Sequence, residues 1–181
     1  MGLADLSQAH GNNVAIAVPG APRPQADALV SDRSDVVLLV RAADCVPVLL
    51  ADPESRVVAA VHAGRQGVVV DVVTRTVEAM HEHGARHVTA WVGPHVCGGC
   101  YEVPQSLQDD VADVVPTTRC HTSWGTPALD IGAGVRAQLE AAGVSVDTTA
   151  ARCTVESPDL FSYRRDGASS GRLAGVVRLR P

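Results

Sequence analysis

Two short apolar runs separated by a turn place the strongest constraint on how this chain can fold. Residues 46–51 and 56–61 consist mainly of Val, Leu and Ala, and the DPES segment at 52–55 between them is typical of a turn. We expect two neighbouring buried strands paired antiparallel. Cys45 directly precedes the first run and His62 directly follows the second. Because the start of one strand then lies beside the end of the other, the thiol and the imidazole are expected to come close together.

The hydrophobic period changes after these two runs. Gly64 and Gly67 allow a tight backbone in which main-chain N–H groups remain free for an anion. From residue 69 to residue 80 apolar side chains recur at intervals of three and four, which predicts an amphipathic helix that ends near Gly84. Residues 87–92 are the next expected strand. A strand, helix, strand unit of this kind normally makes a right-handed crossover between parallel strands.

The rest of the pattern predicts a mixed architecture built in layers. At 181 residues, with 46% of them hydrophobic, the chain is expected to form a single domain over residues 1–181 with a sizeable core. The expected fold class is α/β, as a mixed α+β layered sandwich. Further strands are expected at 14–18, 36–40, 144–150 and 173–179, further helices at 3–9, 104–114 and 131–142, and loop or irregular segments at 19–25, 116–126 and 158–170.

Composition disfavours nucleic-acid and membrane partners and bears on the cellular location. The 15 basic residues are all Arg and stand against 20 acidic residues, for a net charge of −5, which disfavours nucleic acid as a partner. The sequence shows neither an N-terminal basic-then-apolar segment nor an apolar run of membrane length, so we expect a cytoplasmic protein with no membrane partner. An odd count of 5 cysteines then favours free thiols or metal ligands over disulfides.

His10, Cys45 and His62 are the candidate metal ligands. Each stands where a regular element meets a turn rich in Gly or Asp, so the side chains can converge on a cleft. One thiolate and two imidazoles suit zinc with a fourth position open for water, and zinc held in this way lowers the pKa of its water to roughly 7. The spacing alone equally permits a small buried Cys45 and two histidines in ordinary loops. It also permits a Cys45 nucleophile with His62 as its base, in an amide hydrolase or deamidase.

Other residues admit two interpretations each. Asp44 could orient a ligand histidine or cap its own turn. Cys97 and Cys100 form a C-G-G-C motif without a second C-x-x-C, which favours loop cysteines over a redox pair or half of a zinc knuckle. Glu156 could move protons or pair with the arginines that follow it.

The Gly- and Ser-rich tail at 161–172 is the candidate anion-binding segment. Tyr163, Arg164, Arg165 and Arg172 lie in it. Guanidinium groups bind phosphate and carboxylate through forked hydrogen bonds. A surface hairpin loop would have a similar composition.

Several stretches, taken together, resemble a known family. The segments SQAHGNNV, ADALV, RAADCVPVLLAD, VAAVHAG, WVGPHVCGGCYEV and LFSYRRDGASSGR occur in the order found in the YfiH-type laccase-domain family, also called polyphenol-oxidase-like purine nucleoside phosphorylases. The resemblance covers nearly the whole chain. It implies zinc ligation by His10, Cys45 and His62, and a sandwich fold shared with a bacterial toxin deamidase domain.

The resemblance also implies an activity. It implies phosphorolysis of adenosine, inosine, guanosine and methylthioadenosine, with deamination of adenosine, so the expected partners are purine nucleosides and phosphate. On this interpretation Cys45, His62 and Asp44 are the catalytic candidates and Arg65, Tyr163, Arg164 and Arg165 are the substrate-binding candidates. The alternatives are the Cys-His hydrolase, a copper-dependent polyphenol oxidase, and a non-catalytic paralogue that binds nucleosides. Copper is less favoured than zinc. A multicopper site needs many histidines, and of the 7 in this chain four lie on helix or loop stretches unrelated to the motifs.

The chain departs from the family pattern in two places. The family usually carries some sixty residues before its Q-x-H-G motif, so the chain is expected to be N-terminally shortened. The usual H-A-G-W-R-G is here H-A-G-R-Q-G at 62–67. Arg65 is then the residue expected to reach an anion, and the aromatic surface for a purine is expected from Tyr163 or Phe161.

Overall fold

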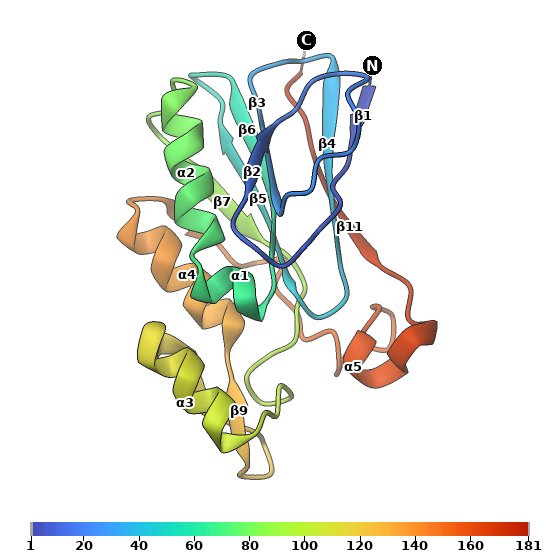
Figure 1. Cartoon of the computed structure of the whole chain (residues 1–181), viewed down its shortest axis with the longest axis vertical. Coiled ribbons are helices and arrows are strands. Elements are labelled where there is room, and N and C mark those ends of the chain that lie inside the picture. The colour runs from blue at the N-terminus through green and yellow to red at the C-terminus, as the bar shows by residue number, and fades with distance from the viewer. Residues whose placement is uncertain (1, 181) are drawn as a thin grey trace.

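The computed structural model describes residues 2–180, and its centre is a mixed sheet of six strands (Figure 1). The strand order is β10-β7-β5-β6-β3-β2. β6 lies near the middle and is buried along its whole length, which explains why its sequence VVAAVHA is almost continuously apolar. The strands of this sheet are β2 Val14–Ile16, β3 Ala28–Ser31, β5 Val46–Asp52, β6 Val57–Ala63, β7 Thr89–Val92 and β10 Ser145–Asp147.

A second, smaller sheet packs on one face of the first. It has the order β1-β4-β11, with β1 parallel and β11 antiparallel to β4. Its buried residues Leu38 and Val40 share a core with Leu29 and Ala60 of the larger sheet. β1 therefore begins, and β11 ends, at the same end of the molecule, on either side of β4 (Figure 1). The strands are β1 Gly2–Ala4, β4 Val36–Ala42 and β11 Leu173–Val177.

Helices cover the opposite face of the larger sheet. The stripe of Val73, Val77 and Met80 on α2 is fully or almost fully buried, and Val135 and Leu139 on α4 join the same core. The result is a sandwich of helices, larger sheet and smaller sheet. The helices are α1 Arg65–Val69, α2 Val72–Glu82, α3 Gln105–Val114, α4 Ile131–Ala141 and α5 Tyr163–Asp166, with 3-10 turns η1 Pro116–Thr118 and η2 Gly167–Ser169 and a short hairpin of β8 Arg119–His121 and β9 Pro127–Leu129.

The central expectation from the sequence is confirmed. β5 and β6 pair antiparallel, with Val46 opposite Ala63 and Pro47 opposite His62. Cys45 therefore lies near His62 at the open end of this hairpin. β6 and β7 both run antiparallel to β5, and are therefore parallel to each other, as the crossover pattern predicts. They are not neighbours, because β5 lies between them.

The structure corrects three expectations. Residues 3–9 were expected to form a helix, but β1 at Gly2–Ala4 pairs with β4 and residues 5–9 have no regular secondary structure, because strand pairing overrides a weak local helical pattern. The buried strand β3, which follows a proline-rich loop, was not foreseen. The tail at 158–170 contains α5 and η2 and is not wholly a loop.

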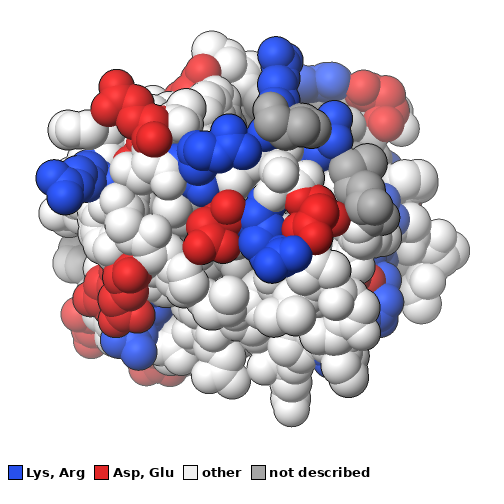
Figure 2. All heavy atoms as spheres, turned by 90° about the horizontal axis from the view of Figure 1, so that it is seen from above, with Lys and Arg blue, Asp and Glu red and all other residues white. Residues whose placement is uncertain are grey.

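The face of the molecule seen from above in Figure 2 has no broad patch of side chains with the same charge. At the face above the sheets, arginines lie next to acidic side chains (Figure 2). No helix between residues 2 and 180 is long and apolar enough to cross a membrane.

A buried carboxylate holds the turn that joins β5 to β6. Asp52 is fully buried and accepts hydrogen bonds from the backbone N–H groups of Glu54 and Ser55 at 3.1 Å each, Arg86 at 2.6 Å and His87 at 2.9 Å. Burial favours the neutral acid, but these donors outweigh it and hold the pKa of Asp52 well below its usual range. The charged form therefore stabilises the hairpin that carries Cys45 and His62.

We expect Asp52→Asn to lower the free energy of unfolding by about 1–3 kcal/mol at neutral pH, because the amide replaces an acceptor oxygen with a donor facing N–H groups. The difference between the two proteins should be present above the unfolded carboxyl pKa of about 4 and should shrink as the pH falls toward the lower folded value. Urea unfolding followed over a pH series measures this. The matched control is Asp35→Asn, an exposed carboxylate that pairs with Arg33 at the surface, which should change stability by at most about 1 kcal/mol.

Candidate metal centre

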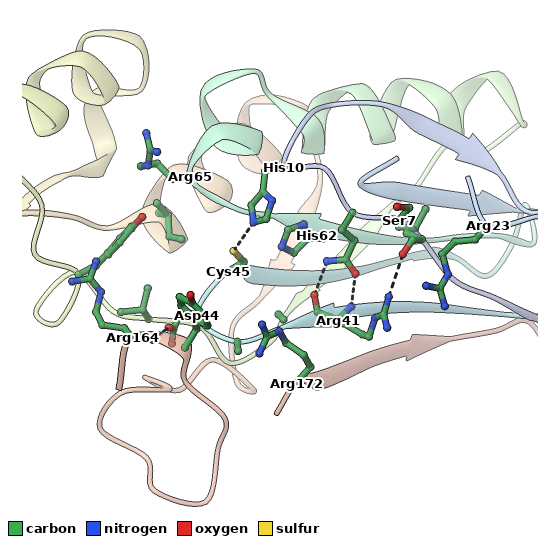
Figure 3. A pocket seen from close by; sticks show the side chains of 18 residues that line it. Ser7, His10, Arg23, Arg41, Asp44, Cys45, His62, Arg65, Arg164 and Arg172 are labelled. Carbon is green, nitrogen blue, oxygen red and sulfur yellow. Dashed lines mark hydrogen bonds between the residues drawn. The ribbon is translucent and has the colours of Figure 1, made fainter. Parts of the chain in front are cut away.

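A cavity of about 890 Å³ opens where the edge of the β5-β6 hairpin meets the N-terminal loop and the C-terminal tail (Figure 3). Its walls come from the loop before β2, the turn between β4 and β5, the start of α1, the loop after β7, and Tyr163, Arg164 and Arg172 of the C-terminal tail. Its size falls in the range of sites that enclose small molecules.

His10, Cys45 and His62 converge in this cavity. One ligand atom from each lies within 4.8 Å of the others. Cys45 Sγ lies 3.8 Å from His10 Nε2, and the two imidazole rings meet edge to face with their centroids 4.8 Å apart. The three side chains are expected to share a cation, and the structure brings them together from three separate segments.

Asp27 holds two of these ligands, and the sequence analysis did not identify it. Its carboxylate is fully buried; it lies 2.9 Å from His62 Nδ1 and accepts from the backbone N–H of His10 at 3.0 Å and of Gly11 at 2.7 Å. With Nδ1 engaged, Nε2 of His62 is the nitrogen left for a metal, which is the usual carboxylate–histidine–metal arrangement. The available signal was an acidic residue immediately before the apolar run at residues 28–30.

The backbone of the site contains two residues in the left-handed region. His10 has a φ of 61° and Asp44 has a φ of 88°, and residues other than Gly rarely adopt such values. The hydrogen bonds to Asp27 hold the first of these turns. Strained backbone of this kind tends to occur at functional sites.

Gly64 leaves room for the ligands. A Cβ atom at this position would lie 2.7 Å from Cδ2 of His10 and 3.1 Å from Sγ of Cys45. The glycine that precedes α1 is therefore required by the close approach of the imidazole and the thiol.

The three ligands alter one another's ionisation. Burial opposes ionisation of Cys45, but hydrogen bonds from His10 and then His62 prevail and lower its pKa to about 7. Burial likewise opposes protonation of His62, yet the bond to Asp27 and the contact with Cys45 raise its pKa to about 9. A thiolate at neutral pH is the state that both a metal and an electrophile require.

Asp44 lines the cavity but makes different contacts from those expected of a histidine-orienting residue. Its carboxylate accepts from Thr154 Oγ1 at 2.6 Å and from the backbone N–H of Arg164 at 2.6 Å. It thereby joins the C-terminal tail to the hairpin edge, while the carboxylate bonded to His62 is that of Asp27.

The cavity wall is rich in arginine and tyrosine. Arg65, Tyr163 and Arg164, which the sequence analysis gave as substrate-binding candidates, line it. Tyr101, which was not foreseen, also lines it, and the guanidinium of Arg164 lies 4.7 Å from the centre of its ring. Arg172 stands 5.7 Å from the ring of Tyr163. The other lining arginines, further along the cavity, are Arg23 and Arg41.

Arg165 does not line the cavity. Its guanidinium donates to the carbonyl oxygens of Thr154 at 2.8 Å, Ser157 at 3.1 Å and Leu160 at 2.7 Å, and it pairs with Asp166. Its donors therefore hold the shape of the tail. Phe161 also lies outside the lining.

These features define a mixed α/β protein with a Cys-His₂ centre inside an arginine-rich cavity. The sequence model of the family described as multi-copper polyphenol oxidoreductase laccase matches residues 2–180. The chain belongs to this family, the YfiH-type laccase-domain proteins.

Similar proteins support the assignment. The purine nucleoside phosphorylase ORF3 of Streptomyces griseus is 51% identical over 181 residues, which cover 96% of this chain and 73% of that protein. The purine nucleoside phosphorylase Cgl2154/cg2365 of Corynebacterium glutamicum is 42% identical over 180 residues, which cover 96% of this chain and 73% of that protein. The crystal structure of Neisseria meningitidis protein NMB0706 superposes with a TM-score of 0.88 at 33% identity, covering 100% of this chain and 76% of that one. The crystal structure of YlmD from Geobacillus stearothermophilus superposes with a TM-score of 0.86 at 28% identity, covering 99% of this chain and 74% of that one.

The donor set suits a single tetrahedral cation. Zinc accepts one thiolate and two imidazoles with a fourth position left open, and Asp27 supplies the outer support. A multicopper centre requires a larger set of histidines. Within residues 2–180 only His10 and His62 join a metal-competent group, while His81 and His95 bond to backbone carbonyl oxygens elsewhere.

We expect Asp27→Asn to weaken zinc binding about 10- to 100-fold, because the amide orients His62 poorly and supports the His10 turn less well. Competition with a fluorescent chelator measures the affinity, and circular dichroism shows whether the variant is folded. Asp35→Asn serves as the control and should bind as the wild type does. Unchanged affinity in folded Asp27→Asn protein would contradict the role given to this carboxylate.

The ionisation of Cys45 gives a second prediction. In metal-free protein, its alkylation by iodoacetamide should rise with pH through about 7, and His10→Ala should move this midpoint upward because its hydrogen bond to the thiolate is lost. Peptide mass spectrometry resolves each thiol. Cys120 is the internal control, since burial raises its pKa to about 11. A Cys45 midpoint near the ordinary value of about 8.5 would count against the arrangement.

Proposed function

We propose that the protein is a zinc-dependent purine nucleoside phosphorylase, with zinc held by His10, Cys45 and His62. The observation that carries the proposal is the position of these ligands in a cavity whose walls present arginine and tyrosine side chains. The names of the relatives from Streptomyces griseus and Corynebacterium glutamicum support the same reaction class.

Arginine side chains are suited to the phosphate. Arg65 begins α1 with one residue between it and the strand that carries His62, and Arg164 donates its own backbone N–H to Asp44. Both side chains line the cavity (Figure 3). Two guanidinium groups can bind a dianion by charge-assisted hydrogen bonds from two sides. Asp44 fixes the backbone of the second one and so acts here as a positioning residue.

Aromatic side chains are suited to the purine. Tyr101 and Tyr163 line the cavity on the loop after β7 and on the tail, which compensates for the aromatic residue absent at Arg65. Each of these rings lies near a guanidinium, from Arg164 and Arg172 respectively. A flat ring system can stack on such surfaces.

The reaction breaks one bond and forms another at the same carbon atom. A phosphate oxygen attacks C1′ of the ribose while the C1′–N9 bond breaks, and its electron pair leaves with the purine. The arginines hold phosphate for this attack and the tyrosines hold the base, so both reactants are oriented before the bond loosens. Bound zinc would supply a Lewis acid that polarises an oxygen atom of the reactants. Adenosine deamination, in which water replaces the amine of the base, is proposed as a second reaction of the same site.

The assay follows adenine, hypoxanthine and inosine when the zinc-loaded protein is incubated with adenosine or inosine and phosphate. We expect phosphate-dependent release of base, a loss in kcat/KM of about 10³-fold or more in Cys45→Ala, and a rise in KM for phosphate of about 10- to 100-fold in Arg65→Ala. Arg136→Ala, an exposed arginine on α4, is the matched control and should leave both constants unchanged. Zinc binding without turnover of any nucleoside would indicate a non-catalytic binding protein.

A second function is favoured by one observation. Cys45, His62 and Asp27 are linked in the order thiol, imidazole and carboxylate, as in cysteine hydrolases. On this alternative the thiolate attacks an amide carbonyl and no metal is required. Amide hydrolysis by chelator-treated protein, abolished in Cys45→Ala, would favour this function, whereas stoichiometric zinc that protects Cys45 from alkylation would oppose it.

A further inference from the structure

A second group of metal-competent side chains lies beside the cavity but outside the centre described above. Cys97 and Cys100 stand on the turn after β7, and Cys153 and Glu156 stand on the segment after β10. One ligand atom from each of the four lies within 4.8 Å of the others. The C-G-G-C motif, interpreted from the sequence as a pair of loop cysteines, thus acquires two partners from residues far along the chain.

Backbone hydrogen bonds fix the two segments against each other. The N–H of His95 donates to the carbonyl oxygen of Arg152 at 3.0 Å, and the N–H of Thr154 donates to that of His95 at 3.0 Å. These bonds make a parallel bridge between Cys153 and His95, which lies two residues before Cys97. The C-G-G-C turn is closed by bonds from the N–H groups of Cys100 and Tyr101 to the carbonyl oxygen of Cys97, at 3.0 and 3.1 Å. The four side chains are therefore held in place by main chain.

The polar atoms of the group already contact one another. Cys97 donates its N–H to Cys153 Sγ at 3.5 Å, and the thiol of Cys100 donates to Glu156 Oε1 at 3.5 Å. The thiols are partly or largely buried, while Glu156 is exposed. Hence the group lies just below the surface, within reach of an ion from solvent.

The donor set and spacing suit a closed tetrahedral zinc site. Zinc–sulfur bonds of about 2.3 Å place neighbouring sulfur atoms about 3.7 Å apart, so the observed limit of 4.8 Å requires only small side-chain rotations. Both pairs have the same spacing, C-x₂-C and C-x₂-E, which lets each turn supply two ligands. Three thiolates and a carboxylate leave no open coordination position, as in structural sites.

We propose that Cys97, Cys100, Cys153 and Glu156 bind a second Zn²⁺ ion, which has a structural role distinct from the His10–Cys45–His62 centre. The ion joins the loop that carries Tyr101 to the segment whose Thr154 hydroxyl donates to Asp44. It therefore fixes the lining loop that carries Tyr101 relative to the segment that anchors Asp44. This inference does not depend on the proposed function, because it concerns a different set of ligands.

Cys120 provides a matched control. It is the remaining cysteine of the chain outside both groups, and it lies near the C-G-G-C turn, where its thiol contacts the carbonyl oxygen of Gly98 at 3.6 Å. It has the same partial burial as Cys97 and Cys153. A loss of zinc caused by general damage to this region would appear in Cys120→Ser as well.

The first experiment counts zinc. Purified wild-type protein and variants are incubated with Zn²⁺, freed of excess by gel filtration and analysed by mass spectrometry of the metal. We expect about two zinc ions per chain in the wild type and in Cys120→Ser, and about one in Cys45→Ser, in Cys153→Ser and in Cys97→Ser. Cys45→Ser combined with Cys153→Ser should hold none.

The second experiment uses a ligand whose replacement does not threaten folding. Glu156 is exposed, so Glu156→Ala should fold normally and should weaken zinc binding at the second site by about tenfold or more, with no change at the first. Cobalt(II) bound to Cys45→Ser protein should show an intense thiolate-to-metal charge-transfer band of a tetrahedral site. That band should be lost in the double variant with Cys153→Ser.

Several results would overturn the inference. One is a wild-type protein with a single zinc ion that disappears in Cys45→Ser. Another is retention of two ions in Cys153→Ser together with unchanged binding in Glu156→Ala. A mass lower by two hydrogen atoms, with a Cys97–Cys153 crosslinked peptide in protein purified under reducing conditions, would assign the group to a disulfide instead. Failure of nucleoside turnover would leave the zinc count unaffected, so the two proposals are separable.

Discussion

The candidate site depends on one buried carboxylate. Asp27 sits at the head of β3 and accepts hydrogen bonds from the turn that carries His10 while it engages Nδ1 of His62. A buried carboxylate is costly unless such donors surround it, and here they come from both segments that must meet. Its backbone oxygen also accepts from the N–H of His62 at 2.8 Å, so main chain and side chain act together. Without this carboxylate, the N-terminal loop would lose the hydrogen bonds that hold the His10 turn beside His62.

The sandwich explains why the remaining parts converge at the same edge. β5 and β6 form a hairpin that is covered on one face by helices and on the other by the smaller sheet, and the cavity opens at its end near Cys45. β11 returns antiparallel to β4, so the tail with Arg164 arrives at that edge and is joined to it through Asp44. Function is thus concentrated in loops supported by a well-packed core.

The two metal-competent groups are joined by a short path. Thr154, next to Cys153, donates to Asp44, next to Cys45, and the N–H of Val96, next to Cys97, donates to the carbonyl oxygen of Asp44 at 3.0 Å. A change in the position of the cysteine-rich turn would therefore move the cavity wall. The arrangement gives a physical reason for a structural ion close to a site whose two halves come from opposite ends of the chain.

Sequence alone determined what local pattern and turn chemistry encode. The antiparallel hairpin follows from two apolar runs and a turn, and that pairing puts Cys45 and His62 together without any knowledge of the fold. Tertiary structure decided the rest, because a contact between residues distant in sequence leaves no local pattern. In the sequence, Asp27 is one more acidic residue before a strand, and Cys153 is an isolated cysteine. Only the folded chain places Asp27 against His62 and Cys153 against Cys97. Arg165 shows the converse, since arginine composition suggests an anion site while its donors bind backbone carbonyl oxygens. Side-chain type is written in the sequence, but the atoms that a side chain meets depend on how the whole chain packs.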